Sequence, residues 1–462
     1  MTIADEINRI TGNIDNAYSA LYDKGATMPA TNNSALLADT INTISTGGGG
    51  YQEVGRYMIV NGVAQLQSGD IDNRFKGIVS INNSAMKGAF NATGLSGEAN
   101  FYSLVEVNDR GLMSCFDNCP NITGMNFSKL EYINDSGAMS SCFYNDTNLQ
   151  GSVDFHSLIS VGTSGLSQAF YNCTNLSGDV NFCNLTSIGQ AGLERLFNSG
   201  TYTVMNVGKN AEINFSSLQV VNTSYAMNFF FYNRGDNTSL NFSSLQVVNG
   251  QMAMQSAFSS SKLADNITFP SLTDVNASSA MASCFAGSTV KNVSFPSLVN
   301  VNGIASMNSC FARCYNLTDI SMPNLVNANF NGVGGSFAQI CEYCNNLVNV
   351  DLSNLATIGN GGFIYSFRGC TNLQSISFNN LSSIGQKGLA SCFTGCTNLA
   401  SISFPALTTS SFGAYTNQFN GMLSGVSDCV VHFPASIEGT INTWTDVTSG
   451  FGGTNTTVLY DL

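Results

Sequence analysis

The amino-acid sequence predicts an α/β solenoid in which short stacked β-strands alternate with short helical or irregular returns, preceded by an N-terminal helical segment. One observation is a repeated phrase: CTNLASISFPAL (396–407) has a near copy, CTNLQSISFNNL (370–381). Another is the regular recurrence of its leucine, because a fixed period of about 20–50 residues is typical of solenoids. A third is the alternation of apolar and polar residues in ISF, which indicates a short strand with one buried face.

Residues 1–46 are predicted to form the helical segment and to attach or oligomerise the chain. Their apolar residues recur at alternating spacings of four and three, which is the pattern of a coiled-coil seam. The seam residues are Ile3, Ile7, Ile10, Ile14 and Leu21, with Ala17 between the last two. Isoleucine at both core positions favours trimers or tetramers, so we expect a homotrimer. A hairpin with a second helix over 33–44 fits the pattern equally well.

The repeat body is predicted over residues 99–411, in about twelve units of about 26–27 residues. Before it, residues 47–50 are a glycine linker, and residues 51–98 are an N-terminal cap with a first irregular repeat. The recurrent leucines are Leu104, Leu130, Leu158, Leu185, Leu218, Leu245, Leu272, Leu298, Leu325, Leu355, Leu381 and Leu407. The stretches between strands are short and rich in Ser and Gly, so each return holds at most one or two helical turns.

The last segment, 412–462, departs from the repeat and is predicted to be a C-terminal cap over the open edge of the last coil. It contains Trp444, the single tryptophan of the chain. At the distal end of a fibre, Trp444 would be a candidate receptor contact.

The segment CTNLQSISFNNLSSIGQKGLASCFTGCTNLASISFPAL (370–407) resembles the BspA-type leucine-rich repeat, whose consensus is C-x-x-L-x-x-I-x-F-P-x-x-L. The resemblance covers roughly residues 78–411 and is looser between 186 and 265. It implies a leucine-rich-repeat-like solenoid and a bacterial or phage surface protein that binds host or cell-surface molecules.

The first fifty residues, with stretches such as LADTINTISTGGGG (37–50), resemble N-terminal segments of phage tail and fibre proteins. This second resemblance implies that the N-terminal helices bind another virion protein.

The composition excludes several kinds of partner. The chain has 16 Lys and Arg against 29 Asp and Glu, a net charge of −13, whereas nucleic-acid binders and polybasic membrane anchors carry basic patches. The N-terminus shows no secretory signal, and no apolar run is long enough to predict a transmembrane helix. We therefore expect no nucleic-acid partner and no membrane partner.

The chain has fourteen cysteines, ten of which recur in two columns. We interpret them as buried packing thiols because free cysteine behaves as a small hydrophobe. Disulfides and a zinc site, which needs four converging ligands, are the less favoured alternatives, and no metal or cofactor is expected. Aligning the units on a recurrent phenylalanine assigns Ser336 and Ile340 to these columns in the unit that contains Phe337.

No catalytic residue is predicted, and the chain is expected not to be an enzyme. His156 and His432 lie in strand-like segments without the sequence context of a catalytic nucleophile, and a G-x-S-x-G motif is absent. The carboxylates are scattered, whereas a polysaccharide depolymerase, the enzymatic alternative, needs a close pair.

The candidate ligand-binding residues form a polar column, one from each strand, directly before the recurrent phenylalanine. Short amides and hydroxyls match the hydroxyl groups of sugars, so this column is a candidate surface for a glycan or peptide. The alternative is that any solvated strand face needs polar residues. Beginning at Asn100, the column continues through Asn126, Asp154, Asn181, Asn214, Asn241, Thr268, Ser294, Ser321, Asp351, Ser377 and Ser403.

Together these features predict a non-enzymatic structural protein of a phage virion, a tail or head fibre exposed on the virion surface. Its solenoid and distal cap would bind a glycan or protein of the bacterial surface. The alternative is a leucine-rich repeat adhesin, on the bacterial surface or secreted, that binds host molecules.

Overall fold

The computed structural model describes strand residues 59–60, 63–64 and 68–70, residue 75, and residues 77–462 except 135, 199–210, 235–236, 329–334 and 415–416. The predicted helical segment 1–46, its seam residues and the glycine linker lie outside the described residues.

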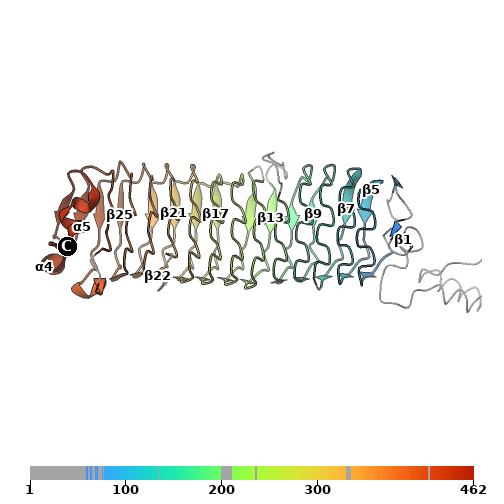
Figure 1. Cartoon of the computed structure of the whole chain (residues 1–462), viewed down its shortest axis with the longest axis horizontal. Helices are drawn as coiled ribbons and strands as arrows, with labels where there is room; N and C mark the ends of the chain where they lie inside the picture. The colour runs from blue at the N-terminus through green and yellow to red at the C-terminus, as the bar shows by residue number, and fades with distance from the viewer. Residues whose placement is uncertain are drawn as a thin grey trace, which may run out of the picture.

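The chain forms an elongated solenoid whose coils lie side by side along one axis (Figure 1), which confirms the predicted fold class. Each full coil places one strand in each of two sheet faces. Face 1 contains β3 (Ser68–Asp70), β5 (Gly94–Asn100), β7 (Ile122–Asn126), β9 (Val153–Asp154), β11 (Val180–Asn181), β13 (Glu212–Asn214), β15 (Ser239–Asn241), β17 (Asn266–Thr268), β19 (Asn292–Ser294), β21 (Asp319–Ser321), β23 (Asn349–Asp351), β25 (Ser375–Ser377), β27 (Ser401–Ser403), β28 (Val430–His432) and β29 (Thr457–Leu459).

Face 2 is built from shorter strands, two residues each, that follow the recurrent leucine. They are β4 (Ser80–Ile81), β6 (Glu106–Val107), β8 (Tyr132–Ile133), β10 (Ser160–Val161), β12 (Ser187–Ile188), β14 (Val220–Val221), β16 (Val247–Val248), β18 (Asp274–Val275), β20 (Asn300–Val301), β22 (Asn327–Ala328), β24 (Thr357–Ile358) and β26 (Ser383–Ile384). Before the first coils, β1 (Ile59–Val60) and β2 (Val63–Ala64) pair antiparallel.

The strands of both faces pair parallel and in register, so that equivalent residues of successive coils are neighbours. Ser375, for example, pairs with Ser401 and Ile376 with Ile402. The recurrent leucine is buried in every unit, and it closes the turn between the two faces, where the Leu104 N–H donates to the Phe101 carbonyl oxygen over 3.0 Å.

The core is a set of stacked phenylalanine columns. Face-1 rings stack on their copies in the next coil, as Phe269 does on Phe295 at 5.2 Å between ring centroids. A second column comes from the returns, where Phe258 and Phe285 stack at 5.5 Å. Offset stacking of this kind adds to the burial of each ring, so the period of the sequence becomes a continuous aromatic core.

The returns take the irregular rather than the helical form, yet they follow a regular scheme of overlapping turns. In the return after β6, Met113 N–H donates to Arg110 O (3.1 Å), three residues earlier, whereas Ser114 N–H donates across to Ser140 O of the next coil (2.9 Å). Arg110, Ser114 and Asn118 have positive φ values of 59°, 51° and 58°, as the third residue of a type II turn does. Alternate N–H groups thus bind the neighbouring coil, which a helix, with its N–H groups bonded internally, does not allow.

Helices occur only after residue 408 in the part of the chain that the structure describes. They are η1 (Thr409–Phe412), η2 (Ala435–Ile437), α4 (Glu438–Ile441), α5 (Thr445–Thr448) and η3 (Gly450–Gly452). None of them is long and apolar enough to cross a membrane.

The C-terminal segment 412–462 adds two strands to face 1 besides these helices. β28 continues the parallel register from β27, and β29 pairs with β28. The helices α4 and α5 lie at the C-terminal end of the solenoid in Figure 1. Between them Trp444 is half-buried and meets Phe412 edge to face, with ring centroids 4.9 Å apart.

In two coils, a smaller core residue next to the face-1 strand is matched by a larger core residue in the return. The strand position holds Phe295, Met322, Leu352 and Phe378 in successive coils, while the equivalent return position holds Met307, Phe337, Phe363 and Leu389. Met322, Leu352, Phe337 and Phe363 line one small apolar void. Where the strand residue is smaller, the return residue is therefore larger, and the core stays filled except for this small void.

This exchange predicts non-additive mutations. Leu352→Phe alone overfills the core and should lower the free energy of unfolding by roughly 1–3 kcal/mol. Adding Phe363→Leu restores the arrangement of the neighbouring coils, so the double variant should be more stable than the sum of the single changes by about 1 kcal/mol or more. Urea unfolding of the four proteins in this cycle checks the prediction, and additivity would contradict it.

Candidate functional site

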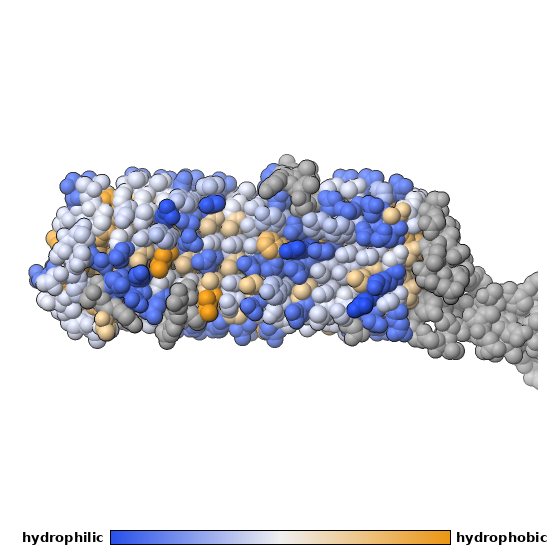
Figure 2. Space-filling view, viewed as in Figure 1, coloured by the Kyte–Doolittle hydropathy of each residue, from blue (hydrophilic) through white to orange (hydrophobic). Residues whose placement is uncertain are grey.

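The predicted polar column lies in register on the outer side of face 1. Asp154, Asn181 and Asn214 pair in succession, and so do Thr268, Ser294, Ser321 and Asp351. All the predicted column residues are half-buried or exposed. Figure 2, in the same view as Figure 1, shows a mainly hydrophilic face on which hydrophobic residues form small separate patches.

The Asn and Asp residues of the column close Asx turns. In each, the side-chain Oδ1 accepts a hydrogen bond from the backbone N–H two residues later, at 3.0–3.2 Å. The residues that do so are Asn100, Asn126, Asp154, Asn181, Asn214, Asn241 and Asp351. Such a bond ends a strand and starts a turn.

Proline explains where the column changes to Ser and Thr. Pro270, Pro296, Pro323 and Pro405 each stand two residues after a column position. Proline has no N–H to donate, and these four column positions hold Thr268, Ser294, Ser321 and Ser403. Among the Ser and Thr positions of the column, only Ser377 is followed two residues later by a residue with an N–H, Asn379. The Ser377 hydroxyl donates to Asn379 Oδ1 instead. Turn chemistry therefore accounts for the residue type along the column, a signal already legible in the sequence.

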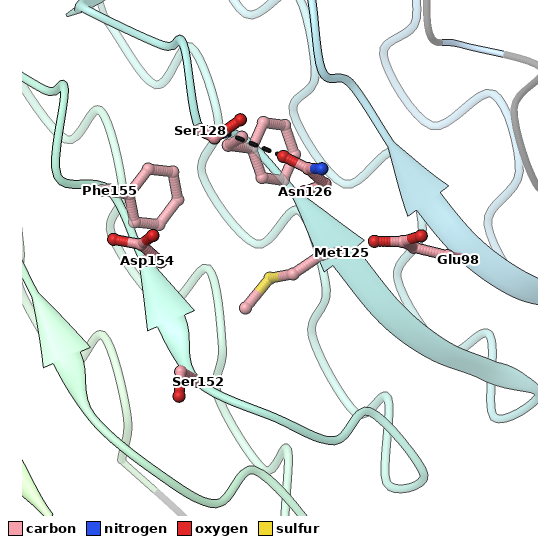
Figure 3. A pocket seen from close by; sticks show the side chains of 8 residues that line it. Glu98, Met125, Asn126, Ser128, Ser152, Asp154 and Phe155 are labelled. Atoms are coloured by element: carbon pink, nitrogen blue, oxygen red, sulfur yellow. Dashed lines mark hydrogen bonds between the residues drawn. The ribbon is translucent and has the colours of Figure 1, made fainter.

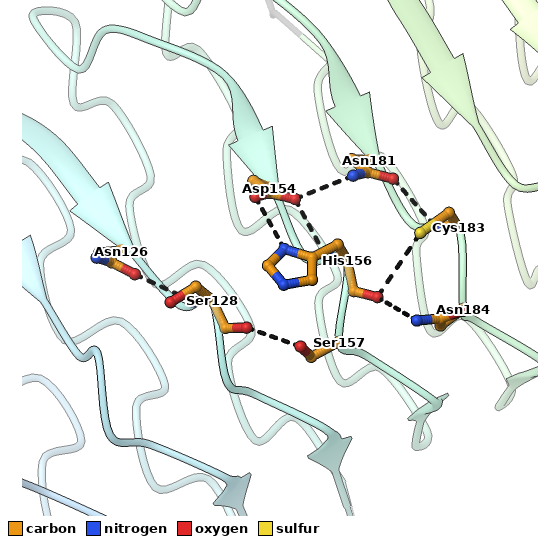
Figure 4. A network of polar contacts seen from close by, with 8 residues as sticks. All are labelled: Asn126, Ser128, Asp154, His156, Ser157, Asn181, Cys183 and Asn184. Atoms are coloured by element: carbon orange, nitrogen blue, oxygen red, sulfur yellow. Dashed lines mark hydrogen bonds and ion pairs between the residues drawn. The ribbon is translucent and has the colours of Figure 1, made fainter.

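The two histidines each lie beside a carboxylate at the face-1 surface. His156 Nδ1 is 2.9 Å from Asp154 Oδ2, and the Asp154 Oδ1 also accepts the side-chain amide of Asn181 at 3.1 Å (Figure 4). His432, in register with Ser403, lies 2.9 Å from Asp461. Both side chains are partly exposed, as expected for polar residues on a strand.

Face 1 is interrupted between β7 and β9. No ladder joins these two described strands, although Gln150 N–H still donates to Thr123 O (3.1 Å) on one side, and Ser157 Oγ donates to Ser128 O (2.7 Å) on the other. The coils therefore part locally and rejoin. The sequence signal is the 28-residue spacing from Leu130 to Leu158, which is longer than the adjacent spacings of 26 and 27 residues.

The parting opens a hollow of about 230 Å³, which we call the slot. Figure 3 shows Glu98 on β5, Met125 and Asn126 on β7, and Ser152 and Asp154 next to and on β9 around this gap. The lining residues are Glu98, Met125, Asn126, Phe127, Ser128, Ser152, Asp154 and Phe155. Two of the predicted column residues, Asn126 and Asp154, are thus brought to one concave site.

A second hollow, of about 320 Å³, lies on the return surface. Small residues form its floor, and Arg313 and Glu342 are its charged lining. Glu342 is nearly buried and accepts a hydrogen bond from Arg368, 3.3 Å away, which also lies over the Tyr343 ring.

The cysteines are unpaired thiols, and all but Cys183 are buried, which confirms the packing interpretation for those thirteen. In the second column the thiol donates to a backbone carbonyl oxygen of the preceding coil: Cys314 to Phe285 O (3.0 Å) and Cys396 to Phe367 O (2.9 Å). Ser261 makes the same bond with its hydroxyl. Within the described residues, no group of His, Cys, Asp and Glu is arranged to hold a metal ion.

The column assignment around Phe337 was wrong by one turn of the return. Cys344 Sγ donates to Phe311 O (3.0 Å), so Cys344, and not Ile340, is the second-column residue of that coil. Cys341 takes the place of the recurrent phenylalanine, since Cys370 Sγ donates to Cys341 O (3.2 Å). Ile340 then falls in the first column in place of Ser336. The alignment failed because Phe337 belongs to the neighbouring core position described above.

An elongated stack of in-register coils, each closed by a buried leucine, defines a leucine-rich repeat protein. The family model for the BspA type leucine rich repeat region matches the sequence in six copies, over residues 77–198, 225–363 and 338–424. The chain belongs to this family. No curated protein matches the sequence.

Several solved structures are similar to the chain. A leucine-rich repeat protein from Bacteroides ovatus has 19% identity and a TM-score of 0.41, covering 82% of this chain and 87% of that one. A leucine rich cell surface protein from Faecalibacterium prausnitzii has 13% identity and a TM-score of 0.21, covering 82% and 83%. An internalin from Listeria monocytogenes has 12% identity and a TM-score of 0.22, covering 72% and 82%.

The Asx turns predict which column positions matter for stability. Asn214→Ala removes the acceptor of the Ser216 N–H (3.0 Å) and should cost about 1 kcal/mol, whereas Asn214→Asp keeps it. Thr268→Ala should be near neutral, because Pro270 offers no N–H. Thermal unfolding of the three variants compares these effects, and equal losses at Asn214 and Thr268 would refute the turn explanation.

A second prediction concerns Asp146, which occupies a thiol-column position. It is fully buried; its Oδ1 accepts the Cys119 N–H at 2.6 Å, and its Oδ2 has no partner in the described structure. Burial raises the pKa of Asp146 to about 9. The folded state therefore keeps a proton that the unfolded state loses near pH 4.

Stability should accordingly fall as pH rises between about 4 and 9, by at most about 1.4 kcal/mol per pH unit from this group. Asp146→Asn keeps an acceptor for Cys119 and should flatten this slope. Urea unfolding at mildly acidic and mildly alkaline pH measures it, with Asp351→Asn as a surface control. An unchanged slope in Asp146→Asn would show that Asp146 ionises freely in the fold.

Proposed function

We propose that the chain is a non-enzymatic recognition protein that acts at a bacterial surface and binds its ligand on face 1. The observation that carries this proposal is the polar column, which places one residue on face 1 in every coil from β5 to β27 and is in register within each of the four sheets of that face. Membership of the BspA-type family supports it, since the sequence resemblance implies surface proteins that bind host or cell-surface molecules.

The geometry of the column suits an extended polymer. The Asx turn occupies Oδ1 of each asparagine and leaves the Nδ2 group as a donor, as Asn181 shows by donating to Asp154. Neighbouring parallel strands lie about 4.8 Å apart, so each sheet of face 1 offers donors and acceptors at even intervals. A glycan or an extended peptide with its own repeating hydrogen-bonding groups matches such a surface.

The slot is the place on face 1 where the enzymatic alternative can be considered. A glycoside hydrolase needs two carboxyl groups roughly 5–10 Å apart across the bound sugar, and the slot holds two carboxylates, Glu98 and Asp154. The match to the leucine-rich repeat family does not favour hydrolysis. We therefore propose a binding protein rather than an enzyme.

The virion fibre is the second candidate, and it rests on the sequence of the first fifty residues. The family match begins at residue 77 and does not cover them. Light scattering of the full chain separates the two candidates: a fibre should be a trimer that Ile7→Asn with Ile14→Asn converts to a monomer. A monomeric full chain would favour the free surface adhesin.

Binding of the labelled full chain to bacterial cells, epithelial cells and immobilised surface glycans tests the proposal. We expect saturable binding that drops at least about ten-fold, or about 1.4 kcal/mol, when face 1 carries Asn214→Asp and Thr268→Asp. A variant with the same added charge on face 2, Ser187→Asp with Ser383→Asp, is the matched control. Equal loss in both variants, or no binding to any of these surfaces, would refute the proposal.

A further inference from the structure

We propose that the slot between β7 and β9 binds one sugar residue of an uncharged glycan, with Glu98 and Asp154 as its main hydrogen-bond acceptors. The inference rests on the proposed function and names the ligand class for one part of face 1. Three properties of the slot carry it: the chemistry of its lining, the rigid placement of its polar groups, and its preformed shape.

The lining is rich in acceptors and contains no cation. It comprises two carboxylates (Glu98 and Asp154), the amide of Asn126 and the hydroxyls of Ser128 and Ser152. Carboxylates accept strong hydrogen bonds from hydroxyl groups, whereas they repel phosphate, sulfate and uronate groups. Met125 is half-buried between the polar groups (Figure 3) and offers an apolar surface to the carbon face of a sugar ring.

Asp154 is held in place by three contacts with two neighbours, His156 and Asn181. Its Oδ1 accepts the His156 N–H (3.1 Å) and the Asn181 amide (3.1 Å), and its Oδ2 lies 2.9 Å from His156 Nδ1. Each carboxylate oxygen has two lone-pair sites, so Oδ2 keeps capacity for a ligand. Groups that are fixed in advance lose less entropy when a ligand binds.

Glu98 lies where the pairing of β5 with β7 is irregular. Gly97 pairs with Ile122 and Glu98 with Gly124, so Thr123 is an extra residue in β7, and Gly97 in β5 has a φ of 94°. Bulges of this kind re-aim nearby side chains and are common next to active sites. Glycine is suited to this backbone angle, which most side chains disfavour.

The slot is open without any movement of the coils. In neighbouring coils, the phenylalanine after the column residue donates its N–H to the next strand: Phe101 to Asn126 O (2.8 Å) and Phe155 to Asn181 O (2.9 Å). The corresponding bond from Phe127 to Asp154 is missing from the same series. Face 1 is also interrupted between β23 and β25. The small void near that interruption, lined by residues on and next to β21 and β23 and by residues of the returns, differs from the slot because its lining is almost wholly apolar.

Saturation-transfer NMR with the full chain tests the proposal. The probes are free D-glucose, D-galactose, D-mannose and N-acetyl-D-glucosamine at millimolar concentration, with D-glucuronate as the anionic counterpart. We expect transfer to at least one neutral sugar and none to glucuronate. Glu98→Gln and Asp154→Asn should each weaken binding about ten-fold, which corresponds to one lost charge-assisted hydrogen bond.

Two further variants keep the test decisive. Ser152→Trp should fill the exposed rim of the slot and abolish transfer without touching either carboxylate. Asp274→Asn is the matched control, since Asp274 on β18 of face 2 also accepts an asparagine side-chain amide, that of Asn300 (2.8 Å), away from the slot and the polar column, and it should bind as the parent does. Thermal unfolding of each variant verifies that the fold is retained.

Binding of a neutral sugar that persists in the slot variants would overturn the slot while leaving the proposed function standing, because the ligand would then lie elsewhere on face 1. Absence of transfer to all four neutral sugars would also overturn it. So would transfer that disappears with a chelator, since this would identify a cation site instead. Failure of the proposed function is separate: the full chain would then bind none of the cell surfaces tested above.

Discussion

The in-register stacking of coils is the constraint on which the rest of the structure depends. Once Ser375 pairs with Ser401 and Ile376 with Ile402, every side chain meets its own equivalent one coil away. Aromatic rings then stack on rings, thiols find the same carbonyl in each preceding coil, and polar residues line up along a face. The residue type at a position in one coil is thus constrained by the equivalent residues in the adjacent coils, as in other solenoids, where each repeat contacts only its neighbours.

This constraint explains how much of the fold the sequence alone could predict. The period of the leucines and the alternation in segments such as ISF require a parallel stack with one buried strand face, and the structure has it. The conformation of the returns was harder to foresee, because Ser, Asn and Arg adopt positive φ values there at positions where glycine is the expected signal. Their hydrogen bonds go to the next coil, so no local pattern along the chain reveals them.

The site was predictable to a lesser degree, for physical reasons. The polar column was visible, and the prolines that follow Thr268 and Ser294 could have shown that turn chemistry shapes it. The slot depends on two strands that part by a small distance, which is a property of three dimensions. Only the longer spacing before Leu158 and the glycine at position 97 hint at it. In the binding that we propose for the slot, the departure from the repeat supplies the concave site, whereas the repeat itself supplies rigidity.

The interruptions of face 1 have a mechanical meaning as well. They divide this face into sheets of three strands (β3–β7) and then of four (β9–β15, β17–β23 and β25–β29). Tension along the long axis passes from coil to coil through rows of backbone hydrogen bonds, and at each interruption one row is missing. A surface protein pulled by flow would therefore extend in blocks of a few coils, with the joint beside the slot among the first to yield.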